Sequence, residues 1–394
     1  MKYDFDKLID RRNTRSVKWD YRGEKFGRSD VLPMWVADMD FPSPPGTAEA
    51  IAKRAEHGVF GYMGISEELT GAIIGWMEKR NGWRPEEGWV VHSPGVVTSI
   101  LTAILAYTET GDGILIQTPV YRPFYSSISD NGRKIVASPL INNNGRYEMD
   151  FDDLERKLAS GVRMMILCSP HNPVGRVWTA EELKNLAGLC VRHNCIVVSD
   201  EIHSDLIYRG YKHTPFAVVR DDILPNTVTC ISPTKTFNLA GLSESMAIIP
   251  DPGLRRKFQG TMHRTGAGML NIFGLEAARA AYLYGEPWLE ELLSYLEGNA
   301  ETLAGFVRER LPSIRMEKPE GTYLAWLDCR ELMDKVGNLK SFFVSKAGVG
   351  MNEGVEFGRE GEGFQRLNFA CPRAMLEDGL QRMENAIKGM GSDV

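Results

Sequence analysis

The sequence has no long apolar run and no concentration of like charges. No apolar stretch approaches the roughly 18 residues that a membrane span needs. The 46 Lys and Arg residues against 52 Asp and Glu residues give a net charge of −6, without blocks of one sign. We therefore expect neither a nucleic acid nor a membrane as a partner. Residues 1–16 are charged throughout and lack the apolar core of a signal peptide, so we expect a cytoplasmic protein.

Cysteine is scarce, and no metal-binding or hydrolase motif is present. The six cysteines form no C-x-x-C pair and no zinc-type spacing, which predicts buried free thiols in a reducing compartment. H-E-x-x-H, P-loop and G-x-S-x-G motifs are also missing. Asp38 and Asp40 alternate with apolar residues, which is typical of a turn or cap, so we expect no metal. The cysteines are Cys168, Cys190, Cys195, Cys230, Cys329 and Cys371.

The middle of the chain alternates strand and helix patterns. Residues 164–168 and 195–198 predict two buried strands, and Thr179 and Glu182 between them predict the capping box of a helix. Strand, helix and strand at this spacing indicate a right-handed parallel crossover, and hence an α/β core. Further strands are predicted at 113–117, 228–231 and 245–249, and a further helix at 96–107.

The C-terminal part has a different pattern. Residues 287–309 predict a long helix, and strands at 323–327 and 364–369 flank a helix around 341–347. We interpret this part as a smaller α+β domain that packs with the N-terminal arm. A length of 394 residues predicts two or three domains at about 150 residues each. We predict an arm at 1–45 that belongs to the small domain, a large domain at 46–285 and the small C-terminal domain at 286–394.

Three polar residues follow predicted strands. Asn172, Asp200 and Lys235 come after the strands at 164–168, 195–198 and 228–231, and ligands of parallel sheets bind at such strand ends. Taken singly, they could be a turn residue, a helix cap and a solvated amine. Together, an amide, an acid and an amine suit pyridoxal 5'-phosphate (PLP), which carries a phenolic oxygen, a ring nitrogen and an aldehyde.

The segments around these residues resemble the fold-type I PLP-dependent enzymes of the aspartate aminotransferase superfamily. The matching motifs are Ser169–Gly175, Ser199–His203 and Ser232–Lys235. Within the superfamily the chain resembles the cystathionine β-lyase (C–S lyase) branch in Arg15–Asp20, Pro33–Phe41, Lys235–Leu242 and Leu367–Arg373. The resemblance implies a PLP-dependent transferase-like large domain with a mostly parallel seven-stranded sheet, plus the smaller domain.

The resemblance also implies roles for the residues at the strand ends. Lys235 would bond to the cofactor aldehyde and later take the proton from substrate Cα, and Asp200 would keep the pyridine nitrogen protonated. Asn172 would bind the phenolic oxygen, and Tyr121 would stack on the ring. His203 lies near this cluster, either as a cofactor contact or as a structural histidine.

The phosphate and the substrate need their own contacts. Gly95 and the backbone N–H groups of Val96 and Val97 would receive the phosphate at a helix start, with the Ser232 hydroxyl and with Tyr62 lent by a second subunit. The resemblance therefore implies a homodimer with composite sites. Arg373 would bind the α-carboxylate of an amino-acid substrate, assisted by the backbone of Ala37. Ser243 stands where many aminotransferases have an arginine for the phosphate, which favours the lyase branch.

These features predict β-elimination of a thiol from L-cystathionine or a related cysteine S-conjugate, giving pyruvate and ammonia. An aminotransferase would use the same lysine and aspartate, and only Ser243 and the branch-specific segments oppose it. A PLP-bound regulatory protein that acts through a protein partner is an alternative of another class.

Overall fold

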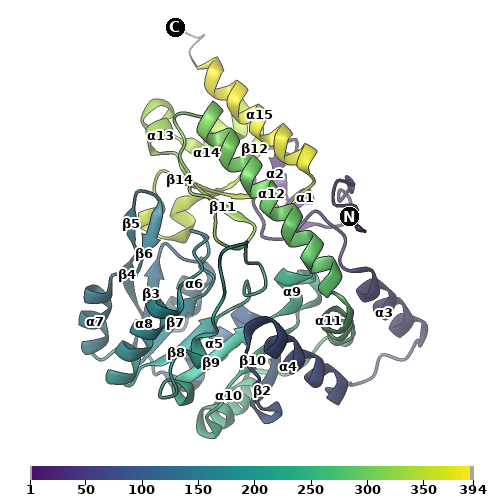
Figure 1. Ribbon diagram of the computed structural model, residues 1–394, viewed down its shortest axis with the longest axis vertical. Coiled ribbons are helices and arrows are strands. Elements are labelled where there is room, and N and C mark those ends of the chain that lie inside the picture. Colours follow the sequence, from purple (N-terminus) through teal and green to yellow (C-terminus); the bar gives the residue numbers. More distant parts are fainter. Residues whose placement is uncertain (1, 391–394) are drawn as a thin grey trace.

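The main sheet of the protein is the seven-stranded, mostly parallel sheet expected from the resemblance. The computed structural model describes residues 2–390. The sheet has the order β2-β10-β9-β8-β7-β3-β4, and β10 runs antiparallel to both of its neighbours. In this order its strands are Val90–Ser93, Ser245–Ile248, Thr227–Ile231, Ile196–Asp200, Met164–Cys168, Gly113–Thr118 and Lys134–Pro139. Figure 1 shows the sheet in the lower half of the molecule.

The interior strand β7 shows why these residues form a sheet covered on both faces. Met164, Ile166 and Cys168 pack into one apolar cluster, whereas Met165 and Leu167 pack into another. Helices α5 (Val96–Tyr107), α6 (Pro123–Ser129) and α10 (Pro252–Thr265) contribute to the first cluster, and α7 (Phe151–Ala159) and α8 (Ala180–Arg192) to the second. A parallel strand buried on both faces reads as a continuous apolar run, as it does here.

The predicted elements of the large domain are confirmed. Helix α8 begins with the capping box of Thr179 and Glu182, and its apolar stripe is buried. The strands expected at 113–117, 164–168, 195–198, 228–231 and 245–249 are present with bounds that differ by at most two residues. The six cysteines are free and buried. Within residues 2–390 no helix is both long and apolar enough to cross a membrane.

The C-terminal part forms a second sheet with the order β11-β14-β13. Its strands are Leu324–Asp328, Phe364–Asn368 and Asn352–Glu353, and helix α12 (Glu286–Arg310) packs against α15 (Arg373–Gly389) beside it. The helix expected at 341–347 is α14 (Leu339–Phe342) followed by a π-helical turn, Phe343–Ala347. The difference is a change of helical pitch within one continuous segment.

The N-terminal arm joins this C-terminal part. Strand β1 (Leu32–Pro33) pairs in parallel with β12 (Val349–Gly350), and the Phe5 ring lies 5.8 Å from that of Trp288. Both contacts agree with the predicted assignment of the arm to the small domain, while the boundaries 1–45, 46–285 and 286–394 stay predictions. The remaining α-helices and longer strands are α1 (Val17–Asp20), α2 (Arg22–Phe26), α3 (Pro45–Glu56), α4 (Glu67–Asn81), α9 (Pro233–Thr236), α11 (Ile272–Tyr284), α13 (Arg330–Val336), β5 (Ile141–Asn143) and β6 (Arg146–Glu148).

The capping box of α8 gives a stability prediction. Thr179→Ala removes the oxygen that accepts the Glu182 N–H, so we expect the free energy of unfolding to fall by about 1 kcal/mol. Urea unfolding followed by circular dichroism measures the change. Thr179→Ser keeps a capping hydroxyl and should unfold close to the wild type; equal midpoints for the alanine variant and the wild type would contradict the assignment.

Candidate active site

A cavity of about 230 Å³ lies at the carboxyl ends of β7, β8 and β9. It brings together all of the predicted site residues except Ser232, Tyr62 and Arg373. Those that line it are Ala37, Gly95, Val96, Val97, Tyr121, Asn172, Asp200, His203 and Lys235. Since the three strands are parallel neighbours, residues far apart in the sequence meet at this edge of the sheet.

Lys235 lies on the short helix α9, which begins directly after β9. Its Nζ donates a hydrogen bond to the carbonyl oxygen of Ala37 at 2.6 Å. Burial in the cavity lowers the pKa of Lys235 to about 8, although the negative charges of Asp38 and Asp200 act in the opposite direction. A primary amine with this pKa is partly unprotonated near neutral pH, as a nucleophile or a base requires.

Asp200 ends β8 and is buried. Its Oδ1 accepts the N–H of Ile202 at 3.2 Å. Burial raises the pKa of Asp200 to about 7, against the opposing effects of this hydrogen bond and of Lys235. A protonated ring nitrogen beside the carboxyl would favour its charged form. Asp200 therefore fits a cofactor that carries a cationic ring atom.

Asn172 lies in the turn after β7 and binds an arginine that the sequence analysis missed. Its Oδ1 accepts Nη1 of Arg366 at 3.1 Å, which leaves the amide NH₂ of Asn172 as a donor. Arg366 is buried on β14 and also donates from Nη2 to the carbonyl oxygen of Trp35 and to Asn352. Within the described residues its buried Nε has no partner. A buried guanidinium with a free donor fits a substrate carboxylate.

Arg373 does not lie in the cavity, so the structure does not support the expectation that it binds the substrate there. The chain leaves β14 and turns at Pro372 into α15, which carries Arg373 toward α12. There its Nε donates to Asn299 at 2.6 Å, and its guanidinium lies over the ring of Tyr295. An arginine inside the otherwise mostly apolar segment 364–369 was the sequence signal that could have singled out Arg366.

The start of α5 provides an anion site beside Lys235. Gly95 precedes the helix with φ 141°, and neither a capping side chain nor an acidic residue occupies its first turn. The N–H groups at the start of this 12-residue helix are therefore left for a ligand, and Val96, Val97 and Thr98 line the cavity. Such a helix end suits a phosphate.

Ser232 is not among the residues that line the cavity, and its expected contact with the phosphate stays a prediction. Its hydroxyl caps α9 by accepting the N–H of Thr234 at 3.1 Å, and it donates to the carbonyl oxygen of Glu244 at 2.6 Å. The hydroxyl-bearing residues that do line the cavity are Thr98, Thr234 and Ser243. Ser243 adopts the left-handed conformation at φ 53°.

Tyr121 and His203 complete the walls of the cavity. Tyr121 is half-buried, and burial raises its pKa above the ordinary value. His203 is buried with its ring 6.0 Å from that of Tyr323. Burial lowers the pKa of His203 to about 3, assisted by the charges of Lys235 and Arg366, so the imidazole is neutral at neutral pH.

Tyr62 lies outside the cavity on the segment 57–66 between α3 and α4, which follows the outside of the molecule (Figure 1). Its side chain is fully exposed, and Val59 and Phe60 beside it are more than half exposed. Within one chain Tyr62 therefore takes no part in the site.

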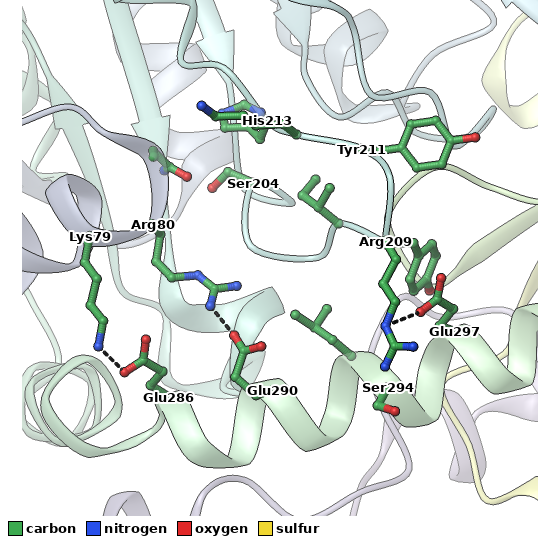
Figure 2. A pocket seen from close by; sticks show the side chains of 15 residues that line it. Lys79, Arg80, Ser204, Arg209, Tyr211, His213, Glu286, Glu290, Ser294 and Glu297 are labelled. Carbon is green, nitrogen blue, oxygen red and sulfur yellow. Dashed lines mark hydrogen bonds and ion pairs between the residues drawn. The ribbon is translucent and has the colours of Figure 1, made fainter.

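A second, open pocket lies between α4, α12 and the loop 204–213 (Figure 2). Three acidic side chains of this pocket are each paired with a basic one: Glu286 with Lys79, Glu290 with Arg80, and Glu297 with Arg209. These groups are paired with each other, whereas the cavity at the strand ends contains an amine and a carboxyl with shifted pKa values. We therefore place the candidate active site at the strand ends.

The seven-stranded sheet and the lysine and carboxyl at its strand ends agree with the resemblance to fold-type I PLP-dependent enzymes. Comparison with known proteins agrees with it as well. The family model described as aminotransferase class I and II matches residues 29–383, and the chain belongs to this family. It is 47% identical to the protein named cystathionine beta-lyase PatB of Bacillus subtilis (strain 168), over 97% of this chain and 99% of the relative.

Two solved structures are similar over nearly their whole length. The structure of cystalysin from Treponema denticola, described as containing a pyridoxal 5'-phosphate cofactor, has a TM-score of 0.95 and 35% identity, covering 99% of this chain and 100% of that one. The PLP-bound C–S lyase from Staphylococcus hominis has a TM-score of 0.93 and 35% identity, covering 98% of both chains.

The lowered pKa of Lys235 gives a prediction about pH. Below about pH 8 the amine is protonated and does not attack an aldehyde, so we expect the rate of PLP capture by cofactor-free protein to rise through pH 8 and then level off. Stopped-flow absorbance measures this rate, with Lys235→Ala as the blank. A rate that continues to rise to about pH 10, as for a solvated lysine, would contradict burial of the amine.

Proposed function

We propose that this protein is a PLP-dependent carbon–sulfur β-lyase. It would cleave L-cystathionine or a related cysteine S-conjugate into a thiol, pyruvate and ammonia. The observation that carries the proposal is the meeting of Lys235 and Asp200 in one cavity, beside the uncapped start of α5. The similarity to a relative named cystathionine beta-lyase supports the same reaction.

The residues of the cavity fit PLP group by group. The free N–H groups of α5 would hold the phosphate, with Thr98, Thr234 and Ser243 as candidate hydroxyl donors. The NH₂ of Asn172 would donate to the phenolic oxygen, because its own oxygen is engaged by Arg366. Tyr121 would stack on the ring. When bound, PLP supplies an electron sink that stabilises negative charge at the substrate Cα.

Three side chains would perform the elimination. Arg366 binds the substrate α-carboxylate through its free Nε, and so fixes the substrate relative to Lys235. Lys235, whose lowered pKa leaves part of its amine unprotonated near neutral pH, would take the proton from Cα. Asp200 holds the proton on the ring nitrogen. The β-thiolate then leaves with the electron pair of the Cβ–S bond, and the released enamine hydrolyses to pyruvate and ammonia.

Ala37 and His203 have supporting parts in this proposal. The carbonyl of Ala37 faces Lys235, so the predicted contact with the carboxylate would use its N–H. His203 would contact the cofactor ring as a neutral imidazole.

The choice of lyase over aminotransferase depends on fewer residues. Lys235 and Asp200 serve both reactions, whereas Ser243 lines the cavity where many aminotransferases have an arginine for the phosphate. The names of the Bacillus subtilis relative and of the Staphylococcus hominis structure favour the lyase as well.

We also propose that the enzyme is a cytoplasmic homodimer. The exposed segment around Val59, Phe60 and Tyr62 would pack on a second copy, and Tyr62 would reach the phosphate of that copy. The six buried free thiols fit a reducing compartment.

The lyase proposal predicts that purified holoenzyme releases pyruvate from L-cystathionine without any keto acid. A lactate dehydrogenase-coupled assay follows the release, and Lys235→Ala should abolish it because both the cofactor bond and the base are lost. Turnover that requires an added keto acid, with no pyruvate from several thioether amino acids, would instead establish an aminotransferase.

The two arginines of the segment 366–373 can be separated by matched variants. Arg366→Lys keeps the charge but loses the guanidinium fork, so we expect kcat/KM to fall by about 10²-fold, from about 1.5–3 kcal/mol lost with a charged hydrogen bond. Arg373→Lys should stay within about threefold of the wild type, as expected of a substitution away from the site. A larger loss of kcat/KM for Arg373→Lys than for Arg366→Lys would instead identify Arg373 as the residue that binds the carboxylate.

Mixed dimers test the composite site. Tyr62→Ala and Lys235→Ala are each expected to be weakly active or inactive alone, because each damages every site of its own dimer. If Tyr62 serves the neighbouring site, mixing and reassociating the two variants puts both lesions into one site and leaves the other intact. Recovered pyruvate release supports the shared site; reassociated dimers without recovery would contradict it.

A further inference from the structure

The carbonyl oxygen of Ala37 accepts two hydrogen bonds from side chains of the site. It accepts the Lys235 amine at 2.6 Å and the hydroxyl of Tyr323 at 2.9 Å. In the proposed reaction the Lys235 amine would be released when the substrate binds, and the free amine would need an acceptor close by. The position of the Ala37 peptide therefore bears directly on the position of the catalytic amine.

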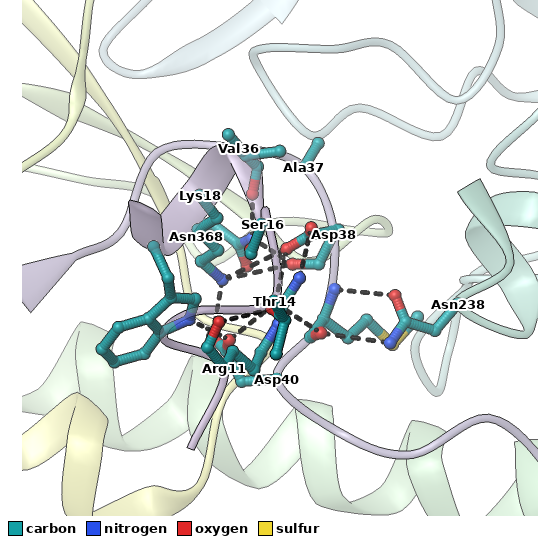
Figure 3. A network of polar contacts seen from close by, with 12 residues as sticks. Arg11, Thr14, Ser16, Lys18, Val36, Ala37, Asp38, Asp40, Asn238 and Asn368 are labelled. Carbon is teal, nitrogen blue, oxygen red and sulfur yellow. Dashed lines mark hydrogen bonds and ion pairs between the residues drawn. The ribbon is translucent and has the colours of Figure 1, made fainter. Parts of the chain in front are cut away.

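Two asparagines fix the peptides on both sides of Ala37 (Figure 3). Asn368 donates from Nδ2 to the carbonyl oxygens of Val36 and Asp38, the latter at 2.7 Å. Asn238 accepts the N–H of Met39 at 3.0 Å and donates to its carbonyl oxygen at 3.1 Å. The segment that carries Ala37 is thus held from the large sheet side by Asn238 and from β14 by Asn368.

Side chains of the N-terminal arm hold the same segment through charge. Arg11 contacts Asp38 and Asp40, each at 2.8 Å. Lys18, which is 1% exposed, lies 2.6 Å from Asp40 and 3.7 Å from Asp38. Trp19 adds a hydrogen bond to Asp40 at 2.8 Å. Figure 3 shows Arg11 and Lys18 beside Asp38 and Asp40, in the turn that follows Ala37.

The charged and titratable groups that face Lys235 come from several elements. Asp38 and Asp200 favour its protonated form, and Arg366 opposes it. His203 is neutral, and the phenols of Tyr121 and Tyr323 keep their protons. Asp38 is the acidic group whose charge is itself compensated by the arm, through Arg11.

We propose that Arg11 and Asp38 are positioning residues for Lys235: the ion pair holds the Ala37 carbonyl where it receives the Lys235 amine, and it balances the charge that this amine experiences. Removal of Asp38 leaves the arm with excess positive charge and disfavours the ammonium. Removal of Arg11 leaves the negative charge of Asp38 less neutralised and therefore favours the ammonium form of Lys235. The two variants therefore act in opposite directions, which loss of packing alone would not produce. This inference rests on the proposed role of Lys235.

The test is the pH dependence of PLP capture by cofactor-free protein. Relative to the wild type, Asp38→Asn should move the midpoint to lower pH and Arg11→Gln to higher pH, each by about half a unit or more. The double variant should return toward the wild-type midpoint. Arg12→Gln is the matched control, because Arg12 is the next residue of the arm but pairs with the exposed Asp10. It should leave the midpoint unchanged.

Equal midpoints for all variants, or shifts of Asp38→Asn and Arg11→Gln in the same direction, would overturn the inference. Arg11→Lys keeps the charge and should restore the wild-type midpoint. If Asp38→Asn does not fold, Arg11→Gln alone decides, because a midpoint that stays or falls contradicts the proposal. Failure of the proposed role of Lys235 is distinguishable: the wild type itself would then capture no PLP at any pH.

Discussion

Burial of the Lys235 amine is the constraint on which the site depends. Removing an ammonium from water disfavours its charge, and this effect lowers the pKa of Lys235 to about 8. The surrounding groups keep the amine in place. The carbonyl of Ala37 accepts its hydrogen bond, and the charges of Asp38 and Asp200 partly offset the loss of water. Burial raises the pKa of Asp200 to about 7, so its carboxyl is partly protonated near neutral pH. A cationic partner beside it would favour the charged carboxylate.

The fold makes this burial possible. The ends of β7, β8 and β9 provide Asn172, Asp200 and Lys235. The start of α5 lines the same cavity and has uncapped N–H groups there. The small sheet adds Arg366 from β14, and the N-terminal arm adds the segment of Ala37. The site is thus assembled from the large sheet, the C-terminal sheet and the arm, so any movement between these parts would alter the distance between Lys235 and the substrate carboxylate.

The sequence was sufficient for the features that depend on local pattern. The burial of β7 on both faces follows from its continuous apolar run, and the capping box of α8 follows from residue spacing. The parallel order of the strands places Asn172, Asp200 and Lys235 together. The sequence was not sufficient where two similar residues lie a few positions apart. Arg366 and Arg373 share one segment, but Arg366 on β14 binds Asn172 of the cavity, whereas the turn at Pro372 carries Arg373 away to α12. Likewise Ser232 is used by the cap of α9, and Thr234 faces the cavity instead. The predicted role of Tyr62 depends on a second copy of the chain, because its side chain is fully exposed and lies outside the cavity of its own chain.

The most direct test of the account is to locate the lysine that binds the cofactor. Protein reconstituted with PLP is reduced with borohydride, digested and mapped by mass spectrometry. The account predicts that the added mass lies on the peptide that carries Lys235. Added mass on another lysine, or none at all, would contradict the assignment of the cavity at the strand ends as the active site.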